Sequence, residues 1–428
     1  MTPTETLQLL KSTTGFTPLG EATGNLTLGR GTLNERPVHI ALVENKIASG
    51  SIGVKECDKL ASLFRIVGAQ KTPLLLYLDC AGARVSEGLP ALGAFRHMYR
   101  AALEMTLAGA PMTALLGTHC YGGASMLAAL AQQRVFSANT QLAMSGPTIL
   151  AAAAGVSALD ESFRAIASAG IGAAARAKLS PQNVLVWDHT AISTLSASPG
   201  SRHAQHQKLA QHQKLATHPT VAAALALATS QGDTRHDVVQ RKDVAALYPL
   251  GYQGFESTIA SSKVFFGKAK DVSGGIRLLG LIDKRLLGAA RTWALADRVW
   301  ALGAKFAAKG VERVNVLVDC EAHSAQLDDE RAMLSCYLAD LSIALMTLAK
   351  MGAMIETTVL GRVGGGVYVA LAAASHKVNL LHGADIQLLP SKAVASILGD
   401  ADAAQYELAD YVKARVADDE LKVGYLRD

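Results

Sequence analysis

The chain has 428 residues, 50% of them hydrophobic and 18% charged, and this length and composition are typical of a globular protein with two domains. Its 41 Lys and Arg residues barely outnumber its 36 Asp and Glu residues and lie scattered along the sequence, which argues against a nucleic-acid partner and favours an anionic substrate. The five cysteines form no CxxC pair and no zinc-ligand spacing, so we expect no disulfide framework, no structural metal and a reducing, cytoplasmic compartment.

A membrane location is not expected either. The first ten residues include Glu5 and lack a continuous apolar core, unlike a signal peptide. Pro111, Gly117, Gly122 and Gly123 interrupt the longest apolar stretch, and the uninterrupted pieces are too short to span a bilayer.

In the first half, the apolar pattern predicts strands that alternate with helices. Strands are predicted at 38–44, 74–80, 112–116, 134–137 and 141–144, and helices at 55–67, 91–108 and 123–131 and after the Ser145-Gly146-Pro147 turn. This order is typical of an α/β protein.

Two loops of small residues follow the predicted strands. The strand at 74–80 leads into residues 81–83, which are all Ala or Gly, and such residues leave backbone N–H groups uncovered, as an oxyanion hole requires. Gly122 and Gly123 open a predicted helix, whose N-terminus offers N–H groups and a positive dipole end to an anion. We therefore predict that the N–H groups of Ala83 and Gly123 bind the oxygen of a reacting carbonyl.

Residues 196–254 differ in composition from both flanks and contain a tandem HQKLA repeat. We interpret this segment as a linker between an N-terminal domain at 1–195 and a C-terminal domain at 255–428. Its histidines are interpreted as part of a solvated connecting helix or loop, with a metal site as the alternative. These histidines are His203, His206, His212 and His218.

After the linker, the order of the first half returns. Strands are predicted at 278–282, 314–318 and 355–360, and helices at 288–309, 328–350 and 364–374. An Asp-Cys pair ends a strand in both halves, and 24 residues separate Gly123 from Pro147 and Gly366 from Pro390. Self-similarity at a fixed spacing indicates duplication of one supersecondary unit.

Several of these motifs resemble a known family. LDCAGARVSEG resembles the D-x-G-G-x-R-x-x-E motif of carboxyltransferase β-type domains, and THCYGGAS and AMSGP resemble the glycine pair and the Gly-Pro that follow it. VLVDC, an acidic DDE helix start, GRVGGGVYVAL and LLPSKA resemble the γ-type partner domain. The whole chain is similar to the biotin-independent malonate decarboxylases, with β and γ subunits joined. Ala81 stands where the family has Gly, and residues 321–323 (Glu-Ala-His) replace its small loop.

This resemblance implies two tandem crotonase-like domains of the ββα-superhelix type, with the active site between them. It implies decarboxylation of a malonyl thioester, carried by an acyl carrier protein or by CoA, to the acetyl thioester and CO2. The thioester arm would be CoA or phosphopantetheine, and no cofactor would be covalently bound. Other decarboxylase subunits or further copies of the chain would be partners.

The candidate site residues follow from the two loops and their counterparts in the second half. The candidate catalytic residues are Gly82, Ala83, His119, Gly122, Gly123, Gly365 and Gly366. The candidate substrate-binding residues are Arg84, Glu87, Ser125, Gly146, Gly364 and Tyr368, and no metal ligand is assigned. Two of these have structural alternatives, because Arg84 could pair with Glu87 and His119 could bond to the backbone.

Three other functions stay open at this point. Carboxyl transfer to or from biotin needs the same oxyanion holes and differs by needing a biotin-carrier partner. A crotonase-type hydratase or isomerase would need carboxylates near the glycines, and Glu87 is the one good candidate. A noncatalytic subunit that binds an acyl carrier is the alternative outside enzymology.

Overall fold

The computed structural model describes residues 2–156, 159–180, 182–185, 204–230, 253–259, 264–271, 274–309, 312–389 and 406–421. The chain divides into two compact units. Unit 1 comprises Met1–His206 and Ala325–Ala339, and unit 2 comprises Gln207–Ser324 and Asp340–Asp428. Unit 1 therefore includes a short segment from far along the chain, which the predicted domain boundaries do not contain.

Unit 1 is built on an eight-stranded sheet with the order β1-β2-β3-β4-β5-β6-β8, and β7 pairs with β5 outside this path. Its strands are β1 (Thr17–Pro18), β2 (Leu26–Leu33), β3 (Arg36–Val43), β4 (Leu74–Cys80), β5 (Met112–Tyr121), β6 (Gln133–Phe136), β7 (Gln141–Ala143) and β8 (Asn183–Leu185). Its helices include α1 (Pro3–Thr14), α2 (Val54–Gln70), α3 (Gly88–Leu107), α4 (Gly123–Leu130), α5 (Pro147–Ala153), α6 (Glu161–Ile171), α7 (Ala173–Leu179) and α13 (Leu327–Arg331).

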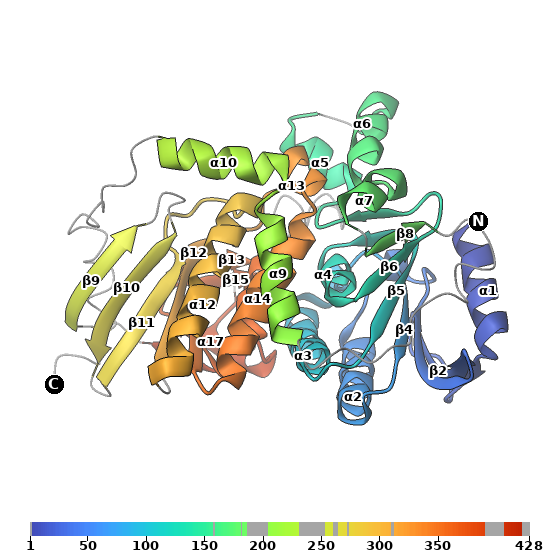
Figure 1. Ribbon diagram of the computed structural model, residues 1–428, viewed down its shortest axis with the longest axis horizontal. Helices are drawn as coiled ribbons and strands as arrows, with labels where there is room; N and C mark the ends of the chain where they lie inside the picture. Colours follow the sequence, from blue (N-terminus) through green and yellow to red (C-terminus); the bar gives the residue numbers. More distant parts are fainter. Residues whose placement is uncertain are drawn as a thin grey trace. The chain divides into compact units, whose positions relative to one another are not determined.

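Alternating side chains of β4 serve two layers of the core. Leu75 and Tyr77 belong to a cluster with Leu9 and Leu10 of α1, and Figure 1 shows α1 on the opposite side of the sheet from α2 and α3. Because successive side chains of a strand point to opposite faces, the remaining leucines of β4 face α2 and α3. All seven residues of β4 are buried, as expected for a central parallel strand.

The strands that carry the predicted loops run parallel, so their carboxyl ends meet at one edge of the sheet. β3, β4, β5 and β6 are parallel neighbours. Between β4 and β5 the register shifts, because Leu78 pairs with Leu116 whereas Cys80 pairs with Cys120. The two extra residues on β5 place Gly117 against Asp79, where a Cβ on the glycine would lie 2.4 Å from the Asp79 Cβ.

Unit 2 has a sheet of the same size, with the order β16-β14-β13-β12-β11-β10-β9 and β15 paired with β13. Its strands are β9 (Gln253–Ile259), β10 (Phe265–Asp271), β11 (Gly274–Leu281), β12 (Arg313–Cys320), β13 (Met354–Gly364), β14 (Lys377–Leu381), β15 (Asp385–Gln387) and β16 (Asp419–Leu421). Its helices include α10 (Pro219–Ser230), α12 (Ala289–Lys309), α15 (Gly365–Ala372) and α17 (Leu408–Lys413), and α9 (Ala204–Leu215) and α14 (Leu334–Lys350) lie mostly in it.

The Asp-Cys corner occurs in both units with the same distortion. In unit 2, Val318 pairs with Val359 whereas Cys320 pairs with Val363, so β13 also carries two extra residues. Gly361 takes the place of Gly117, because a Cβ on it would lie 2.4 Å from the Asp319 Oδ1. Each unit also has an antiparallel strand pair directly followed by a helix, β2 and β3 before α2 and β10 and β11 before α12, which is the ββα order predicted for both halves. The predicted α/β class with two tandem units is confirmed.

Two observations concern the surface. None of the helices in the described part of the chain is long and apolar enough to cross a membrane.

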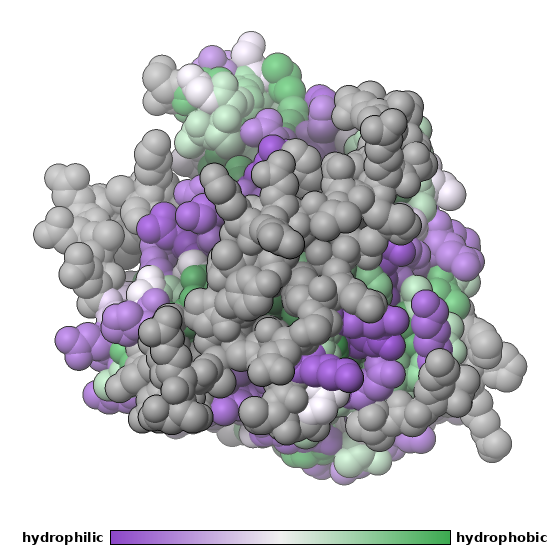
Figure 2. All heavy atoms as spheres, turned by 90° about the vertical axis from the view of Figure 1, so that its left-hand side faces the viewer, coloured by the Kyte–Doolittle hydropathy of each residue, from purple (hydrophilic) through white to green (hydrophobic). Residues whose placement is uncertain are grey.

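Figure 2 shows the face that lies on the left in Figure 1, and hydrophilic and hydrophobic residues are mixed over the part of it that the structure describes.

The predicted linker at 196–254 is described mainly at 204–230, where it forms α9 and α10. His203 lies outside the described residues. His212 is not solvated, which corrects the prediction for this residue. It is 1% exposed, and its Nδ1 lies 2.7 Å from Asp340 Oδ2 and its Nε2 lies 3.5 Å from Asp297 Oδ1. Among the described residues, no group of three or more His, Cys, Asp or Glu side chains is placed to hold a metal ion.

The His212 ring also lies parallel to Trp293 of α12, with 5.0 Å between the ring centroids. Burial lowers the pKa of His212, but hydrogen bonds to Asp297 and Asp340 outweigh burial and raise this pKa to about 9. Trp300 of α12 donates to Asp340 of α14 at 3.4 Å. The histidine therefore joins α9 to two helices that lie side by side in unit 2 (Figure 1).

We predict that His212→Gln destabilises the protein by roughly 3 kcal/mol, because it leaves the buried Asp340 carboxylate without a cation. The folded-state pKa of His212 is raised from 6.5 to about 9, so its contribution is complete below pH 6.5 and is lost as the pH rises through 9. Urea unfolding at pH 6 and pH 9.5 measures both effects. The exposed His382→Gln is the matched control. Equal stabilities of the His212 and His382 variants at pH 6 would contradict the prediction.

Candidate active site

The loop after β4 is held by an isolated parallel bridge between Ile52 and Ala83. The Ile52 N–H donates to the Gly82 carbonyl at 2.8 Å, and the Arg84 N–H donates to the Ile52 carbonyl at 2.9 Å. Because neighbouring residues of an extended chain point their backbone groups to opposite sides, the N–H of Ala83 is turned away from Ile52. The structure gives this N–H no acceptor among the residues that it describes.

The second loop lies directly beside the first. A Cβ on Gly82 would lie 3.1 Å from the Tyr121 carbonyl oxygen and 3.3 Å from the Gly123 nitrogen. Gly82 and Gly122 have φ angles of 99° and 55°, a backbone conformation that favours glycine. Gly123 begins α4, so its N–H has no acceptor within the helix and lies at the positive end of the helix dipole.

The predicted residues Gly82, Ala83, Gly122 and Gly123 therefore lie together at the carboxyl ends of β4 and β5. The N–H groups of Ala83 and Gly123 come from two adjoining loops and can stabilise one negatively charged oxygen. We call these two N–H groups the unit 1 donor pair. A Cβ on Gly123 would lie 2.4 Å from Phe95 Cζ, so this glycine is required by packing on α3 as well as by access to the site.

The His119 ring lies between the Ser49 carbonyl and the Asp79 carboxylate. Its Nε2 lies 3.1 Å from the Ser49 carbonyl, and its Nδ1 lies 3.4 Å from Asp79 Oδ1. The Ser49 carbonyl also accepts the Ala81 N–H at 3.0 Å. These contacts give the ring a role in fixing the loop, and its predicted catalytic role stays a prediction.

Arg84 belongs to a partly buried ion-pair network. Its guanidinium contacts Glu56 of α2 and lies 2.8 Å from Glu87. It also donates to the Ser51 carbonyl at 2.8 Å, and Glu87 accepts the Val54 N–H at the start of α2 at 2.8 Å. The network ties both ends of the Ile52–Ala83 bridge to α2, so Arg84 and Glu87 have structural roles, and their predicted contacts with substrate stay a prediction.

Sequence reasoning missed Glu56, although Gly24 was a signal for it. A Cβ on Gly24 would lie 2.1 Å from Glu56 Oε1, and a Cβ on Gly53 would lie 2.3 Å from Glu87 Oε1. These glycines make room for the carboxylates of the network.

The other predicted substrate-binding residues of unit 1 have structural contacts. Ser125 is buried, and its Oγ donates to the Gly122 carbonyl at 2.7 Å. Gly146 precedes α5, and a Cβ on it would lie 3.2 Å from the Tyr121 ring. Both residues therefore support the turn that carries Gly122 and Gly123.

Unit 2 repeats the arrangement. The Leu287 N–H donates to the Ala322 carbonyl and the Ser324 N–H donates to the Leu287 carbonyl, both at 2.9 Å. The same alternation turns the N–H of His323 to the opposite side. Burial of the His323 side chain lowers its pKa to about 4, so the imidazole is neutral at pH 7.

The glycines of unit 2 stand against this loop. A Cβ on Gly364 would lie 2.7 Å from the Glu321 carbonyl oxygen. Gly365 has a φ of 22°, and Gly365 and Gly366 form the first turn of α15. Tyr368 is 1% exposed and its hydroxyl donates to the Val416 carbonyl at 2.6 Å, and its predicted contact with substrate stays a prediction.

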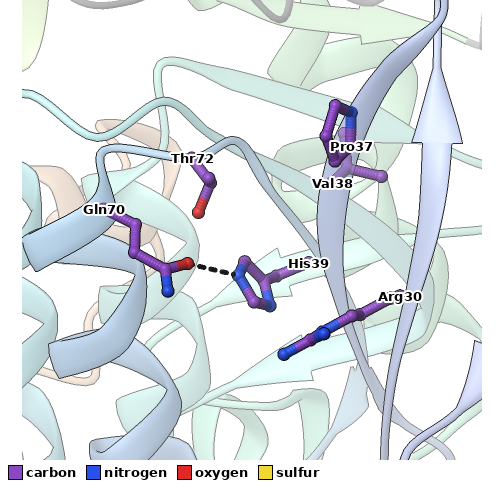
Figure 3. A pocket seen from close by; sticks show the side chains of 6 residues that line it. All are labelled: Arg30, Pro37, Val38, His39, Gln70 and Thr72. Atoms are coloured by element: carbon purple, nitrogen blue, oxygen red, sulfur yellow. Dashed lines mark hydrogen bonds between the residues drawn. The ribbon is translucent and has the colours of Figure 1, made fainter.

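A small pocket of unit 1 lies at the opposite ends of the same strands. It has a volume of about 190 Å³ and is lined by Arg30, Pro37, Val38, His39, Gln70 and Thr72. Figure 3 shows the His39 ring beside Gln70, and its Nε2 lies 3.1 Å from the Gln70 Oε1. His39 pairs with Leu74 at the start of β4, whereas the donor pair follows the end of β4. At about 3.3 Å per residue, the length of β4 separates this pocket from the donor pair.

One further group beside the loops was missed by sequence reasoning. Glu330 of α13 and Arg176 of α7 are both fully buried in unit 1. The sequence marked Glu330 only as part of an acidic helix start, because its partners lie more than 150 residues away.

We predict that Arg84→Met destabilises the protein by roughly 3 kcal/mol, because it leaves the buried Glu56 carboxylate unpaired. Glu87→Gln should cost less than about 1 kcal/mol, because Glu87 is more exposed. The double variant Glu56→Met, Arg84→Met should recover part of the loss. Chemical unfolding of the three variants measures this. Additive losses in the double variant would show that Arg84 and Glu56 are not coupled.

A family model described as the carboxyl transferase domain matches residues 11–168. The chain is 29% identical over 127 residues to the methylmalonyl-CoA carboxyltransferase 12S subunit of Propionibacterium freudenreichii subsp. shermanii, which covers 30% of this chain and 24% of that subunit. It is 31% identical over 98 residues to acetyl-coenzyme A carboxylase carboxyl transferase subunit beta 1 of Roseiflexus castenholzii (strain DSM 13941 / HLO8), which covers 23% of this chain and 33% of that subunit. The matches thus span a third or less of these curated relatives.

Among solved structures, a Pseudomonas malonate decarboxylase hetero-tetramer in complex with malonate is similar over 48% of this chain and 88% of its own, with 20% identity and a TM-score of 0.41. The family match contains both loops of the donor pair, and residues 11–168 of unit 1 therefore match the carboxyl transferase domain.

Proposed function

We propose that the chain is an enzyme that decarboxylates a malonyl thioester, carried by CoA or by an acyl carrier protein, to the acetyl thioester and CO2. The observation that carries this proposal is the unit 1 donor pair. Two backbone N–H groups from adjoining loops suit one oxyanion, and a thioester enolate is such an anion. The match of residues 11–168 to the carboxyl transferase domain supports the same class of chemistry.

The reaction needs no covalent intermediate. The C–C bond to the carboxylate breaks, its electron pair moves into the enolate, and CO2 leaves. The Ala83 and Gly123 N–H groups stabilise the negative charge on the thioester oxygen, and the carbon then takes a proton from water or from an acidic side chain. The equivalent glycine turn of unit 2 is proposed as a second oxyanion-binding turn.

The substrate arm is proposed to be a CoA or phosphopantetheine thioester. Both curated relatives are named for coenzyme A thioesters, methylmalonyl-CoA in one and acetyl-coenzyme A in the other. These names support this class of carrier. No covalently bound cofactor is assigned. Other decarboxylase subunits and further copies of the chain are proposed as partners, and the cytoplasm as the location.

Carboxyl transfer to or from biotin is the second candidate. The match to the carboxyl transferase domain favours it, because both curated relatives are carboxyltransferase subunits. A hydratase or isomerase is not favoured, because Glu87 is bonded to Arg84 and to the Val54 N–H. A noncatalytic carrier-binding subunit is an outcome of the tests below.

We predict that Ala83→Pro lowers kcat for malonyl-CoA by about 10²–10³, because proline removes one donor of the pair. Ala83→Gly is the matched control, because it keeps the N–H, and its kcat should stay within about threefold of wild type. Mass spectrometry of the acetyl thioester gives both rates, and thermal unfolding verifies that both variants fold. A wild-type kcat in Ala83→Pro would remove Ala83 from the site.

A second assay distinguishes decarboxylation from carboxyl transfer to biotin. Wild type should form acetyl thioester from malonyl-CoA or malonyl carrier protein in buffer free of biotin. Product that appears only when biotin or a biotinylated carrier is added would instead establish carboxyl transfer. Binding of the malonyl carrier without turnover under both conditions would identify a noncatalytic subunit.

A further inference from the structure

The turn beneath the unit 1 donor pair is bound by a carboxylate from the other half of the sequence. α13 belongs to unit 1, and Glu330 within it is fully buried. Its Oε2 accepts the Met144 N–H at 3.0 Å, and its Oε1 accepts the Ser145 N–H at 2.7 Å. These two residues follow β7 and precede the Gly146-Pro147 turn.

One peptide group connects Glu330 to Gly122. The peptide between Met144 and Ser145 donates its N–H to Glu330, and its carbonyl accepts the Gly122 N–H at 3.1 Å. A peptide bonded at both ends is polarised, and each bond strengthens the other. The chain of contacts therefore runs from the carboxylate through one peptide plane to the glycine turn that presents the Gly123 N–H.

Arg176 holds Glu330 and β7 together. Its guanidinium donates to the Leu142 carbonyl at 2.7 and 3.0 Å and to the Glu330 carbonyl at 2.6 Å. One guanidinium nitrogen also lies 4.0 Å from the Glu330 carboxylate. Since Leu142 pairs with Cys120 on β5, this arginine fixes the turn against the strand that ends in the donor pair.

We propose that Glu330 is a positioning residue of the unit 1 donor pair, which acts through the Met144–Ser145 peptide to set the orientation of the Gly122-Gly123 turn. This inference rests on the proposed function for its kinetic consequence. Its structural consequence is independent of the substrate, because the ionised carboxylate can accept two N–H bonds whereas the protonated group presents an O–H to one of the two donors.

This position makes the turn sensitive to pH. Burial raises the pKa of Glu330 to about 7, against the opposing effects of Arg176 and of the two backbone N–H groups. The other charged or titratable groups that face it are Tyr121 of β5 and Asp329 of α13, and Cys336 and Arg134 face Arg176. Burial lowers the pKa of Arg176 to about 10 and raises that of Tyr121, so neither of these two residues changes its charge near pH 7.

Positioning and stability have opposite pH dependences here. The folded-state pKa is raised from 4.5 to about 7, so the stability contributed by the protonated group is present below pH 4.5 and is lost as the pH rises through 7. Over the same pH range Glu330 loses its proton, so its carboxylate can accept both N–H bonds, from Met144 and from Ser145. A positioning role therefore predicts that kcat rises while stability falls.

The first experiment measures kcat and KM for malonyl-CoA from pH 6 to pH 8, together with thermal unfolding. Wild type should gain about tenfold in kcat over this range. Glu330→Gln should lower kcat at pH 8 by about ten- to a hundredfold and abolish the rise, with KM within about threefold. Glu330→Asp, which keeps the carboxylate, should keep part of the rise. Asp328→Asn, which changes an exposed acid of the same helix, is the matched control and should keep the wild-type pH profile.

The second experiment needs no substrate, so it separates failure of this inference from failure of the proposed function. Tyr121-Gly122 is the only Tyr-Gly pair in the sequence, and labelling with ¹³C-carbonyl Tyr and ¹⁵N-Gly therefore isolates the Gly122 amide in NMR spectra of the full chain. Its shift should titrate near pH 7 in wild type and stay constant in Glu330→Gln. A Gly122 amide that does not titrate in wild type, or a Glu330→Gln variant with the wild-type titration and pH profile, would overturn the proposal.

Discussion

A backbone N–H that is to bind substrate must point away from every acceptor in its own protein, and this constraint accounts for much of unit 1. In a strand such an N–H normally donates to the neighbouring strand, and in a helix it donates to the carbonyl four residues earlier in the chain. Here the Ile52–Ala83 bridge takes the groups on either side of the Ala83 N–H, and the start of α4 leaves the Gly123 N–H without a helical acceptor.

Holding such a loop in place requires contacts behind it. The network of Arg84, Glu56 and Glu87 ties the first loop to α2, and Arg176 and Glu330 tie the second loop to β7 and α13. Burying a charge is costly unless it is bonded several times, and each of these five side chains makes at least two contacts with backbone groups or with an opposite charge. The pair of networks lets two short loops remain fixed at a sheet edge.

The elements that carry the candidate site could be predicted from the sequence, because they leave a local pattern. The strand ends, the Asp-Cys corners and the glycine turns are adjacent in sequence, so periodicity and residue size were enough to place Ala83 beside Gly123. Residues that contact each other in the fold but lie far apart in the sequence leave no such pattern. Glu56 and Arg176 were missed for this reason, and the inclusion of residues 325–339 in unit 1 could not be derived from composition. His212 was wrongly expected to be solvated, because a polar repeat gives no sign that one of its histidines faces Asp340 and two tryptophans.

The central claim is that the Ala83 and Gly123 N–H groups bind the thioester oxygen. A crystal structure of the chain with a malonyl-CoA analogue that carries a sulfonate in place of the carboxylate tests it most directly, because this analogue cannot lose CO2. Our account predicts the thioester oxygen at about 3 Å from both nitrogens. A thioester bound elsewhere, with both N–H groups facing water, would contradict it.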